Sequence, residues 1–263
     1  MVFDSPYNPE KLTLIAYCFH ADETRFSRVE FGILQTWRCI GKYPLTIVSD
    51  RMTDTILRFK SSHGDICKVI ISPILEAGKP DSMNLDCIVN LHKYFTTPYC
   101  LIIQDDGFPI QSNIEEFLGK WDYIGAPFVR DKPWQFLADL LLINIENGGF
   151  CLRSKNVCSA TSRRYEKLKM KLPERQLKLE DWFYCRIARK NIFHRLRYRF
   201  APAKEARKFS FIDIEGTIDK SSLKTKPFGI HGPTTIWQFQ DILSAEFNFK
   251  TVSMTEVLKN TSL

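Results

Sequence analysis

The fold is decided by residues 99–107, which read YCLIIQDDG. The first five of these residues are apolar or aromatic and show no helical spacing, which is typical of a strand buried on both faces. We expect this strand to end at Ile103, because Gln104, Asp105 and Asp106 follow directly. Two neighbouring carboxylates at a buried strand end are costly unless a positive group lies beside them. The stretch therefore predicts a buried strand with a candidate site at its end.

Strands and helices alternate upstream of this stretch. Short apolar runs predict three further strands, and apolar residues at helical spacing predict three helices. The strands are expected over residues 12–18, 44–50 and 65–71, and the helices over residues 25–40, 53–63 and 84–95. Such alternation is typical of a mostly parallel sheet, which binds ligands at the carboxyl ends of its strands. Besides residues 104–107, this rule singles out His20 and Asp50.

The alternation stops after about residue 110. Short strands, a basic region with helical spacing and a glycine-rich loop are expected there. The strands cover residues 121–128, 146–153 and 209–214, the basic region reaches about Tyr198, and the loop covers residues 227–233. No repeat, low-complexity segment or clear linker divides the sequence, so we expect one domain over residues 1–263. The predicted fold class is α/β, with a mixed, mostly parallel sheet flanked by helices.

The composition is that of a folded protein with a sizeable core. The 263 residues are 44% hydrophobic, 13% aromatic and 25% charged, and the 12 glycines and 13 prolines are scattered. This mixture excludes a disordered, collagen-like or coiled-coil protein. Residues 1–6 lack the basic and apolar parts of a signal peptide, and the longest apolar stretch, residues 136–145, is too short to span a bilayer.

The eight cysteines do not have the pattern of a disulfide framework. Most lie inside apolar runs, as Cys18 and Cys100 do, where a free thiol acts as a small hydrophobic side chain. No pair has the CxxC spacing of a structural zinc site. We therefore expect a reducing compartment and a cytoplasmic protein, either soluble or attached peripherally to the inner face of the membrane.

The positive charge is concentrated in one part of the chain. Residues 152–208 carry a net charge of +13, whereas the rest of the chain carries −6. Within this part, residues 186–199 mix basic side chains with isoleucine, phenylalanine, leucine and tyrosine, which suits an anionic membrane surface as well as a solvated helical face. Binding of nucleic acid is a rival interpretation, but the sequence has no recognisable nucleic-acid-binding motif, so we do not expect it.

Several polar motifs could carry chemistry. The pair Asp105 and Asp106 suits Mg²⁺ or Mn²⁺, which prefer oxygen ligands and bridge carboxylates to phosphates; the alternative is an ordinary turn. The sequence Asn147-Gly148-Gly149 lets the backbone approach a ligand closely, or it makes a simple hairpin turn.

An acidic pair and a late histidine are the remaining candidates. Glu180 and Asp181 are surrounded by basic sequence, and one of them could act as a general base on a hydroxyl nucleophile. The alternatives are a helix cap and a salt bridge to a nearby arginine. His231 lies between Gly229 and Gly232, where an imidazole could bind a metal or a phosphate, or do neither.

Taken in order, these motifs resemble a known family. They read QDDGF at 104–108, WDYIGAPF at 121–128, NGGFCLRS at 147–154, EDWFYC at 180–185 and FGIHG at 228–232. This order resembles the DUF5672 group of glycosyltransferase-like proteins, which are similar to GT-A-fold transferases that use nucleotide sugars. The resemblance covers most of the chain, from about Leu12 to Gly232.

The resemblance implies roles for individual residues. Asp106 and His231 would bind the metal, and Asp105 with Gln104 would lie near the ribose or the donor sugar. Asn147, Gly148 and Gly149 would line the donor pocket, and Asp50 would contact the nucleotide. Asp181, in preference to Glu180, would be the general base. Residues 1 to about 110 would form the nucleotide-binding half, and residues from about 111 to 263 the acceptor half.

The resemblance also implies a reaction. A hexosyl or pentosyl group would move from a nucleotide-diphosphate donor, with UDP preferred, to a hydroxyl group of a glycan or lipid-linked glycan. Transfer would be a single, inverting displacement assisted by Mn²⁺ or Mg²⁺. The alternatives are a catalytically silent module that binds sugar nucleotides and, less favoured, a basic nucleic-acid-binding protein.

Overall fold

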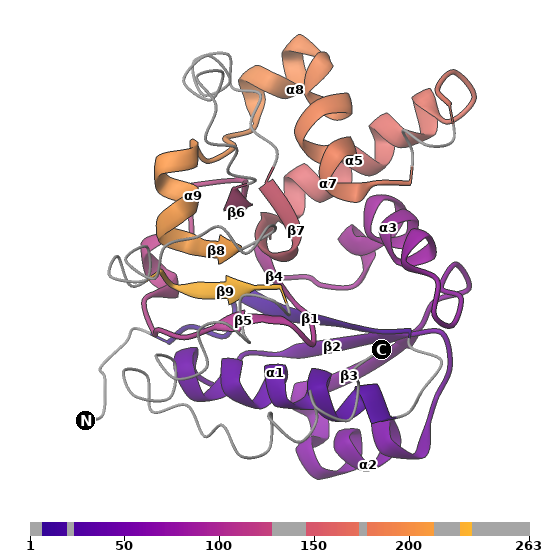
Figure 1. Ribbon diagram of the computed structural model, residues 1–263, viewed down its shortest axis with the longest axis vertical. Helices are drawn as coiled ribbons and strands as arrows, with labels where there is room; N and C mark the ends of the chain where they lie inside the picture. The colour runs from indigo at the N-terminus through magenta and orange to yellow at the C-terminus, as the bar shows by residue number, and fades with distance from the viewer. Residues whose placement is uncertain (1–6, 20–23, 128–145, 174–177, 213–226, 233–263) are drawn as a thin grey trace.

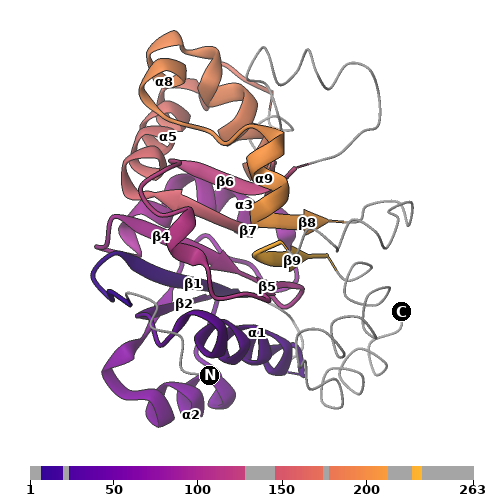
Figure 2. The same cartoon turned by 90° about the vertical axis from the view of Figure 1, so that its left-hand side faces the viewer.

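The computed structural model describes residues 7–19, 24–127, 146–173, 178–212 and 227–232 (Figure 1). His20 and residues 1–6 and 136–145, which figured in the predictions, lie outside these ranges. A six-stranded sheet with the order β3-β2-β1-β4-β7-β6 forms the centre of the described part. Its strands are β1 Leu12–Cys18, β2 Leu45–Ser49, β3 Cys67–Ile71, β4 Tyr99–Ile103, β6 Tyr123–Pro127 and β7 Glu146–Ser154. Figure 2 shows them stacked from β6 near the top to β2 near the bottom.

The sheet is mixed and mostly parallel, as predicted. Strands β1 to β4 are parallel, and β7 is antiparallel to both β4 and β6. Strands β2 and β3 lie on one side of β1 and β4 lies on the other, so the strand order reverses between β1 and β4. In open α/β sheets, ligands bind at the carboxyl ends of the strands beside such a reversal. The end of β4, where Gln104, Asp105 and Asp106 lie, is at this position.

Helices cover both faces of the sheet, because alternate residues of the buried strands point to opposite sides. Leu14 and Ala16 of β1 belong to a core with α1 (Thr24–Ile40) and α2 (Asp54–His63). Ile15 and Tyr17 belong to a second core with α3 (Pro80–Val89) and α5 (Lys155–Leu168). The two cores explain why the strands read as continuous apolar runs rather than alternating ones.

Helix boundaries follow local signals in the sequence. Helix α2 ends at Gly64, which has a φ of 58° and whose amide donates to the Lys60 carbonyl. The predicted helix over residues 84–95 is correct in kind, but α3 begins at Pro80, the favoured first position of a helix, and ends at Val89. A short 3₁₀ turn, Leu91–Lys93, follows it.

The basic region is less regular than its helical spacing predicted. After α5 the chain forms α7 (Glu180–Trp182), a π-helical turn (Phe183–Ile187) and a 3₁₀ turn (Ala188–Lys190). Helix α8 (Ile192–Arg197) and helix α9 (Ala203–Phe209) complete it. Asn191 caps α8 by accepting a hydrogen bond from the His194 amide. Several short turns therefore replace a long helix in this part of the chain.

A small second sheet with the order β5-β9-β8 lies beside the first. Its strands are β5 Gly107–Pro109, β8 Ser210–Ile212 and β9 Gly229–His231. The predicted glycine-rich loop over residues 227–233 is thus partly a strand, because β9 pairs antiparallel with β5 and parallel with β8. The predicted strand over residues 209–214 is confirmed for β8, whereas Phe209 ends α9 and residues 213–214 lie outside the described ranges. The pairing of Gly107 with His231 brings the late histidine to the end of β4.

The cysteines are free thiols, as predicted. Seven of them are buried, and Cys39 is partly buried. In the part of the chain that the structure describes, none of the helices is long and apolar enough to cross a membrane.

Candidate functional site

A tight turn follows β4 directly. The Gln104 amide donates to the Gly107 carbonyl at 3.1 Å, and the Gly107 amide donates back at 3.4 Å. Asp105 and Asp106 are therefore the two central residues of a turn between β4 and β5. The turn that the sequence offered as the alternative to a metal site does form, and it presents both carboxylates at the carboxyl edge of the sheet.

Three side chains meet at this turn, and we call them the Asp106 cluster: Gln104, Asp106 and His231. The Nε2 atom of His231 lies 3.5 Å from Oδ1 of Asp106 and 3.4 Å from Oε1 of Gln104. The Gly232 amide donates to the Asp106 carbonyl at 2.8 Å, which fixes the end of β9 against the turn. The strand pairing of β5 with β9 thus brings together residues more than 120 positions apart.

The Asp106 cluster fits a divalent cation that completes its coordination with phosphate and water. Burial and the neighbouring Asp105 carboxylate raise the pKa of Asp106, and the opposing effects of His231 and Arg28 do not cancel them. A bound cation would relieve this cost by stabilising the charged form. Atoms that share an octahedral Mg²⁺ ion lie about 3 Å apart, close to the separations seen in the cluster. Within the described ranges, no group of three or more His, Cys, Asp or Glu side chains could hold a metal by itself.

Two further acidic residues lie at the same edge of the sheet. Asp105 forms an ion pair with Arg28 of α1 at 3.6 Å, and Asp50, after β2, forms one with Arg51 at 2.9 Å. Burial raises the pKa of the Cys18 thiol at the end of β1, and the carboxylates of Asp105 and Asp50 raise it further. Because β2 and β4 both pair parallel with β1, Asp50 after β2 lies at the same edge of the sheet as the turn after β4.

Residues 147–149 lie at a bulge in β7, and we call these three residues the glycine bulge. Gly125 of β6 pairs with Cys151, whereas the next residue, Ala126, pairs with Asn147, so extra residues of β7 lie between these pairs. The predicted hairpin turn at the two glycines is therefore wrong, since the chain continues in the same strand. The Asn147 side chain closes the bulge by accepting a hydrogen bond from the Gly149 amide at 2.7 Å.

The absence of a side chain at Gly149 lets the glycine bulge touch the Asp106 cluster. A Cβ atom at this position would lie 2.3 Å from Nε2 of His231 and 2.5 Å from Oε1 of Gln104. Both separations are far below van der Waals contact, so a larger residue would force the bulge away from the cluster. The sequence predicted that the backbone approaches a ligand closely at these glycines, and in the structure Gly149 closely approaches the side chains of His231 and Gln104.

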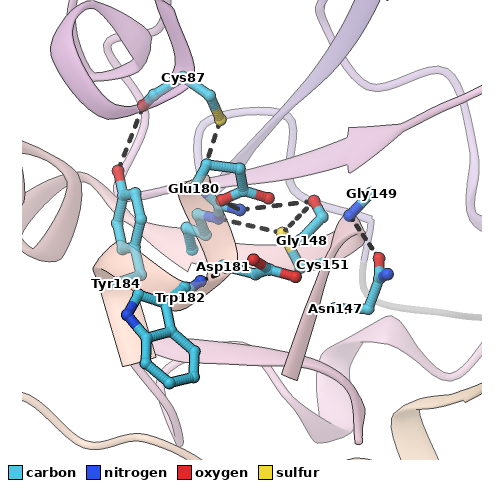
Figure 3. Close-up of polar contacts among 10 residues, drawn as sticks. Cys87, Asn147, Gly148, Gly149, Cys151, Glu180, Asp181, Trp182 and Tyr184 are labelled. Atoms are coloured by element: carbon cyan, nitrogen blue, oxygen red, sulfur yellow. Dashed lines mark hydrogen bonds and ion pairs between the residues drawn. The ribbon is translucent and has the colours of Figure 1, made fainter. Parts of the chain in front are cut away.

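Glu180 lies in a buried ion pair rather than in an open site (Figure 3). Its Oε2 atom accepts a hydrogen bond at 2.5 Å from Nη2 of Arg153, whose side chain is fully buried. The sequence left three roles open for Glu180, namely a general base, a helix cap and a salt bridge to an arginine. The structure shows the salt bridge. Arg153 itself was not among the predicted site residues; it lies in the CLRS motif, but nothing in a strand sequence indicates which acid its side chain will meet.

Asp181 is the acidic residue of this pair that is available for chemistry. Its carboxylate points toward the side of the glycine bulge, and the neighbouring Trp182 ring points away (Figure 3). Burial raises the pKa of Asp181, and the hydrogen bond from the Trp182 amide and the Arg153 charge lower it only in part. A carboxylate with a raised pKa, held in place by the Trp182 amide at 2.6 Å, is suited to accept a proton.

Comparisons with known proteins give a family and a similar fold. The family model described as "Protein of unknown function (DUF5672)" matches residues 84–231, which is more than half of the chain. The sequence matches no curated protein. The apo-form glycosyltransferase GlyE from Streptococcus pneumoniae TIGR4 is similar in structure, with a TM-score of 0.51, 9% identity, and coverage of 92% of this chain and 64% of GlyE. This likeness identifies the architecture as a mixed α/β, GT-A-like fold.

Two further structures are less similar. Core-mannan synthase A from Aspergillus fumigatus, in its Mn/GDP form, has a TM-score of 0.46 and 10% identity, and the match covers 71% of this chain and 68% of that one. The mannosyltransferase PcManGT from Pyrobaculum calidifontis, in complex with GDP-Man and Mn²⁺, has a TM-score of 0.39 and 13% identity. That match covers 60% of this chain and 46% of PcManGT. This chain therefore spans about half to two thirds of the proteins it is compared with.

Proposed function

The chain belongs to the DUF5672 family, and we propose that it is a glycosyltransferase that moves a hexosyl or pentosyl group from a UDP-sugar to a hydroxyl group of a glycan or lipid-linked glycan. One observation carries this proposal. The glycine bulge comes close to the Asp106 cluster at Gly149 and to Glu180, the residue before Asp181, at Gly148, and it lies at the carboxyl edge of a GT-A-like sheet. The diphosphate of the donor would then bind at the cluster, and the acceptor hydroxyl group would bind at Asp181. The donor sugar would lie between them, beside the bulge.

The donor would bind mainly to the first half of the chain, residues 1 to about 110. Asp106 and His231 would hold Mn²⁺ or Mg²⁺, and the cation would supply positive charge to the departing nucleoside diphosphate. Gln104 and Asp105 would lie near the ribose or donor sugar, and Asp50 would contact the nucleotide. Asn147, Gly148 and Gly149 would line the sugar pocket, because Gly149, which has no side chain, comes close to His231 and Gln104 of the cluster.

The acceptor would approach from the second half, residues from about 111 to 263. Asp181 accepts the proton of the acceptor hydroxyl group as its oxygen forms the new bond to the anomeric carbon. The bond between that carbon and the diphosphate oxygen breaks at the same time, and its electron pair leaves with the nucleoside diphosphate. A single displacement of this kind inverts the configuration of the anomeric carbon.

Thermal unfolding with UDP, GDP and dTDP, each with and without Mn²⁺, tests the proposed function. We expect UDP with Mn²⁺ to stabilise the protein most, by about 2.7 kcal/mol at a hundredfold excess over the dissociation constant. Release of UDP from a UDP-sugar then separates an enzyme from a silent module, because a silent module binds the donor without cleaving it. If no nucleoside diphosphate stabilises the protein, with or without the cation, the proposed function is wrong.

An anionic membrane surface is the partner that we propose for residues 186–199. In α8 the side chains of Phe193 and Leu196 are each 78% exposed, and Ile192 is 55% exposed. Arg195 and Arg197 belong to the same short helix, which lies at the opposite end of the molecule from α2 (Figure 1). Exposed apolar groups beside basic ones match the inner face of a membrane, where a lipid-linked acceptor would be found.

Replacement of Phe193 and Leu196 by serine is expected to weaken binding to anionic vesicles by about a hundredfold. Each buried phenylalanine or leucine side chain contributes about 1.5–3 kcal/mol, and tenfold in affinity corresponds to about 1.4 kcal/mol. The measurement is sedimentation with phosphatidylglycerol vesicles, and Leu57→Ser in α2, 49% exposed, is the matched control. Equal sedimentation of the wild type and the double variant would rule out α8 as the contact, and binding of RNA that falls steeply with salt would favour the nucleic-acid alternative.

A further inference from the structure

Arg153 is the fully buried cation of the described core, and its surroundings hold it in one orientation. Its guanidinium carbon lies 4.9 Å from the ring centre of Tyr123 and 4.3 Å from that of Tyr184. Its Nε atom donates to the sulfur of Cys151 at 3.0 Å, and Nη1 donates to the sulfur of Cys87 at 3.3 Å. Two aromatic rings and two thiols therefore fix the plane of the guanidinium group, which leaves Nη2 pointing in a defined direction.

The Nη2 atom of Arg153 joins two segments of the candidate site. It donates to Oε2 of Glu180 at 2.5 Å and to the Gly148 carbonyl at 3.4 Å. Glu180 directly precedes Asp181, and Gly148 is the middle residue of the glycine bulge. A single nitrogen atom thus contacts the turn that bears the proposed base and the loop that lines the proposed sugar pocket.

Gly148 and Glu180 fit together without room for a side chain. A Cβ atom at Gly148 would lie 1.4 Å from Oε1 of Glu180 and 2.6 Å from Nη2 of Arg153. The Glu180 carboxylate therefore occupies the space that any larger residue at position 148 would need. This contact explains why position 148 requires a glycine. The contact with His231 and Gln104 explains the same requirement at position 149.

We infer that Arg153 is a positioning residue, which acts through Glu180 on the orientation of Asp181 and through the Gly148 carbonyl on the glycine bulge. The inference rests on the proposed function, because it assigns Arg153 to the geometry of that same site. Arg153 would touch neither the donor nor the acceptor. A lysine could not replace it, because a single ammonium group lacks the planar set of donors that reaches two sulfurs, a carboxylate and a carbonyl.

The test is the double variant Arg153→Met with Glu180→Met. Removing both charges together leaves no unpaired buried charge, and such replacements are often neutral for stability. We expect the variant to fold and to bind UDP with Mn²⁺ as the wild type does. We expect kcat to fall about a hundredfold while KM for the donor stays the same, because a shift of about 1 Å in a catalytic group can cost that much.

Two controls separate positioning from general damage. Lys120→Met with Glu205→Met removes a partly exposed ion pair of 2.8 Å by the same chemistry, and it should leave kcat unchanged. The second variant, Glu180→Gln, tests the same inference if the double variant does not fold, because it keeps the size and one hydrogen bond of the side chain. We expect this single change to lower kcat by about tenfold, because a neutral hydrogen bond is roughly half as strong as a charge-assisted one.

Hydrogen exchange supplies a measurement that needs no enzymatic activity. In Arg153→Met with Glu180→Met and in Glu180→Gln, amides of residues 146–154 and 178–187 should exchange faster, while those of α5 stay protected. Wild-type kcat in a folded Arg153→Met, Glu180→Met protein, or unchanged exchange in both segments, would overturn the inference. If the wild type itself cleaves no donor, the proposed function fails, and the exchange data still decide whether Arg153 holds the two segments together.

Discussion

Asp181→Asn is expected to lower the rate constant of sugar transfer by about a thousandfold while the protein still binds UDP and Mn²⁺. The amide has the shape of the carboxylate but cannot accept the proton of the acceptor hydroxyl group, and general base catalysis contributes about a hundredfold to ten-thousandfold. Asp181 is separate from the Asp106 cluster, so loss of its charge should leave the binding of nucleotide in place. Single-turnover transfer and nucleotide titration on the same protein measure the two effects separately.

The pH dependence of the wild type gives the same residue a second test. A general base works only when it is deprotonated, and burial raises the pKa of Asp181 above its ordinary value of 3.8. The rate should therefore be full above this raised pKa and fall as the pH decreases through it. The acid limb should be absent from the residual activity of Asp181→Asn. Retention of wild-type turnover by Asp181→Asn, with its acid limb intact, would assign the base to another group.

The matched control for this change is Asp65→Asn. Asp65 is exposed and lies between α2 and β3, away from the carboxyl edge of the sheet, so its replacement tests whether loss of one negative charge alone alters the rate. We expect wild-type transfer and wild-type binding of nucleotide from this variant. A similar loss of rate in both variants would point to the overall charge of the protein rather than to proton transfer at Asp181.

Much of the sheet could be predicted from the sequence, because local patterns decide it. The sequence pattern predicts β1, β2 and β4 from their apolar runs and from the polar residues that end them. The parallel order of these strands follows from the helices between them. The turn at Asp105 and Asp106 was likewise found from a strand that stops at polar residues. These features depend on neighbours in the sequence, so the sequence alone is enough to find them.

The remaining features depend on partners that are distant in the sequence. His231 joins the site because β9 pairs with β5, and no local pattern in a glycine-rich segment shows which strand it will pair with. The two glycines resemble a hairpin turn, but they lie at a bulge where Gly149 comes close to His231 and Gly148 comes close to Glu180. Arg153 and Glu180 are 27 residues apart, and their ion pair follows from the packing of α7 against β7.

Asp106→Asn is expected to remove the stabilisation that Mn²⁺ and UDP give together. Replacing a group that merely supports a metal ligand costs tenfold to a hundredfold in metal affinity, so loss of the proposed carboxylate ligand should cost at least about a hundredfold. In the free protein, burial raises the pKa of Asp106, so its charged form is a cost to the folded state at neutral pH, and this cost shrinks as the pH falls toward the ordinary value. The asparagine variant should therefore be at least as stable as the wild type without ligand, and less stable with it.

Thermal unfolding of both proteins, with UDP at increasing Mn²⁺ concentration, measures these opposite changes directly. Asp65→Asn is again the control, since it removes one carboxylate that is exposed and remote from the Asp106 cluster. If the substitution simply damages the fold, the unfolding temperature will be lower than that of the wild type both with and without ligand. If it removes a metal ligand, the unfolding temperature will be lower than that of the wild type only when UDP and Mn²⁺ are present. If Asp106→Asn keeps the full Mn²⁺-dependent response to UDP, the pair of Asp106 and His231 does not hold the cation. The cation would then have to bind at the other carboxylate of the turn, Asp105, at the cost of its ion pair with Arg28.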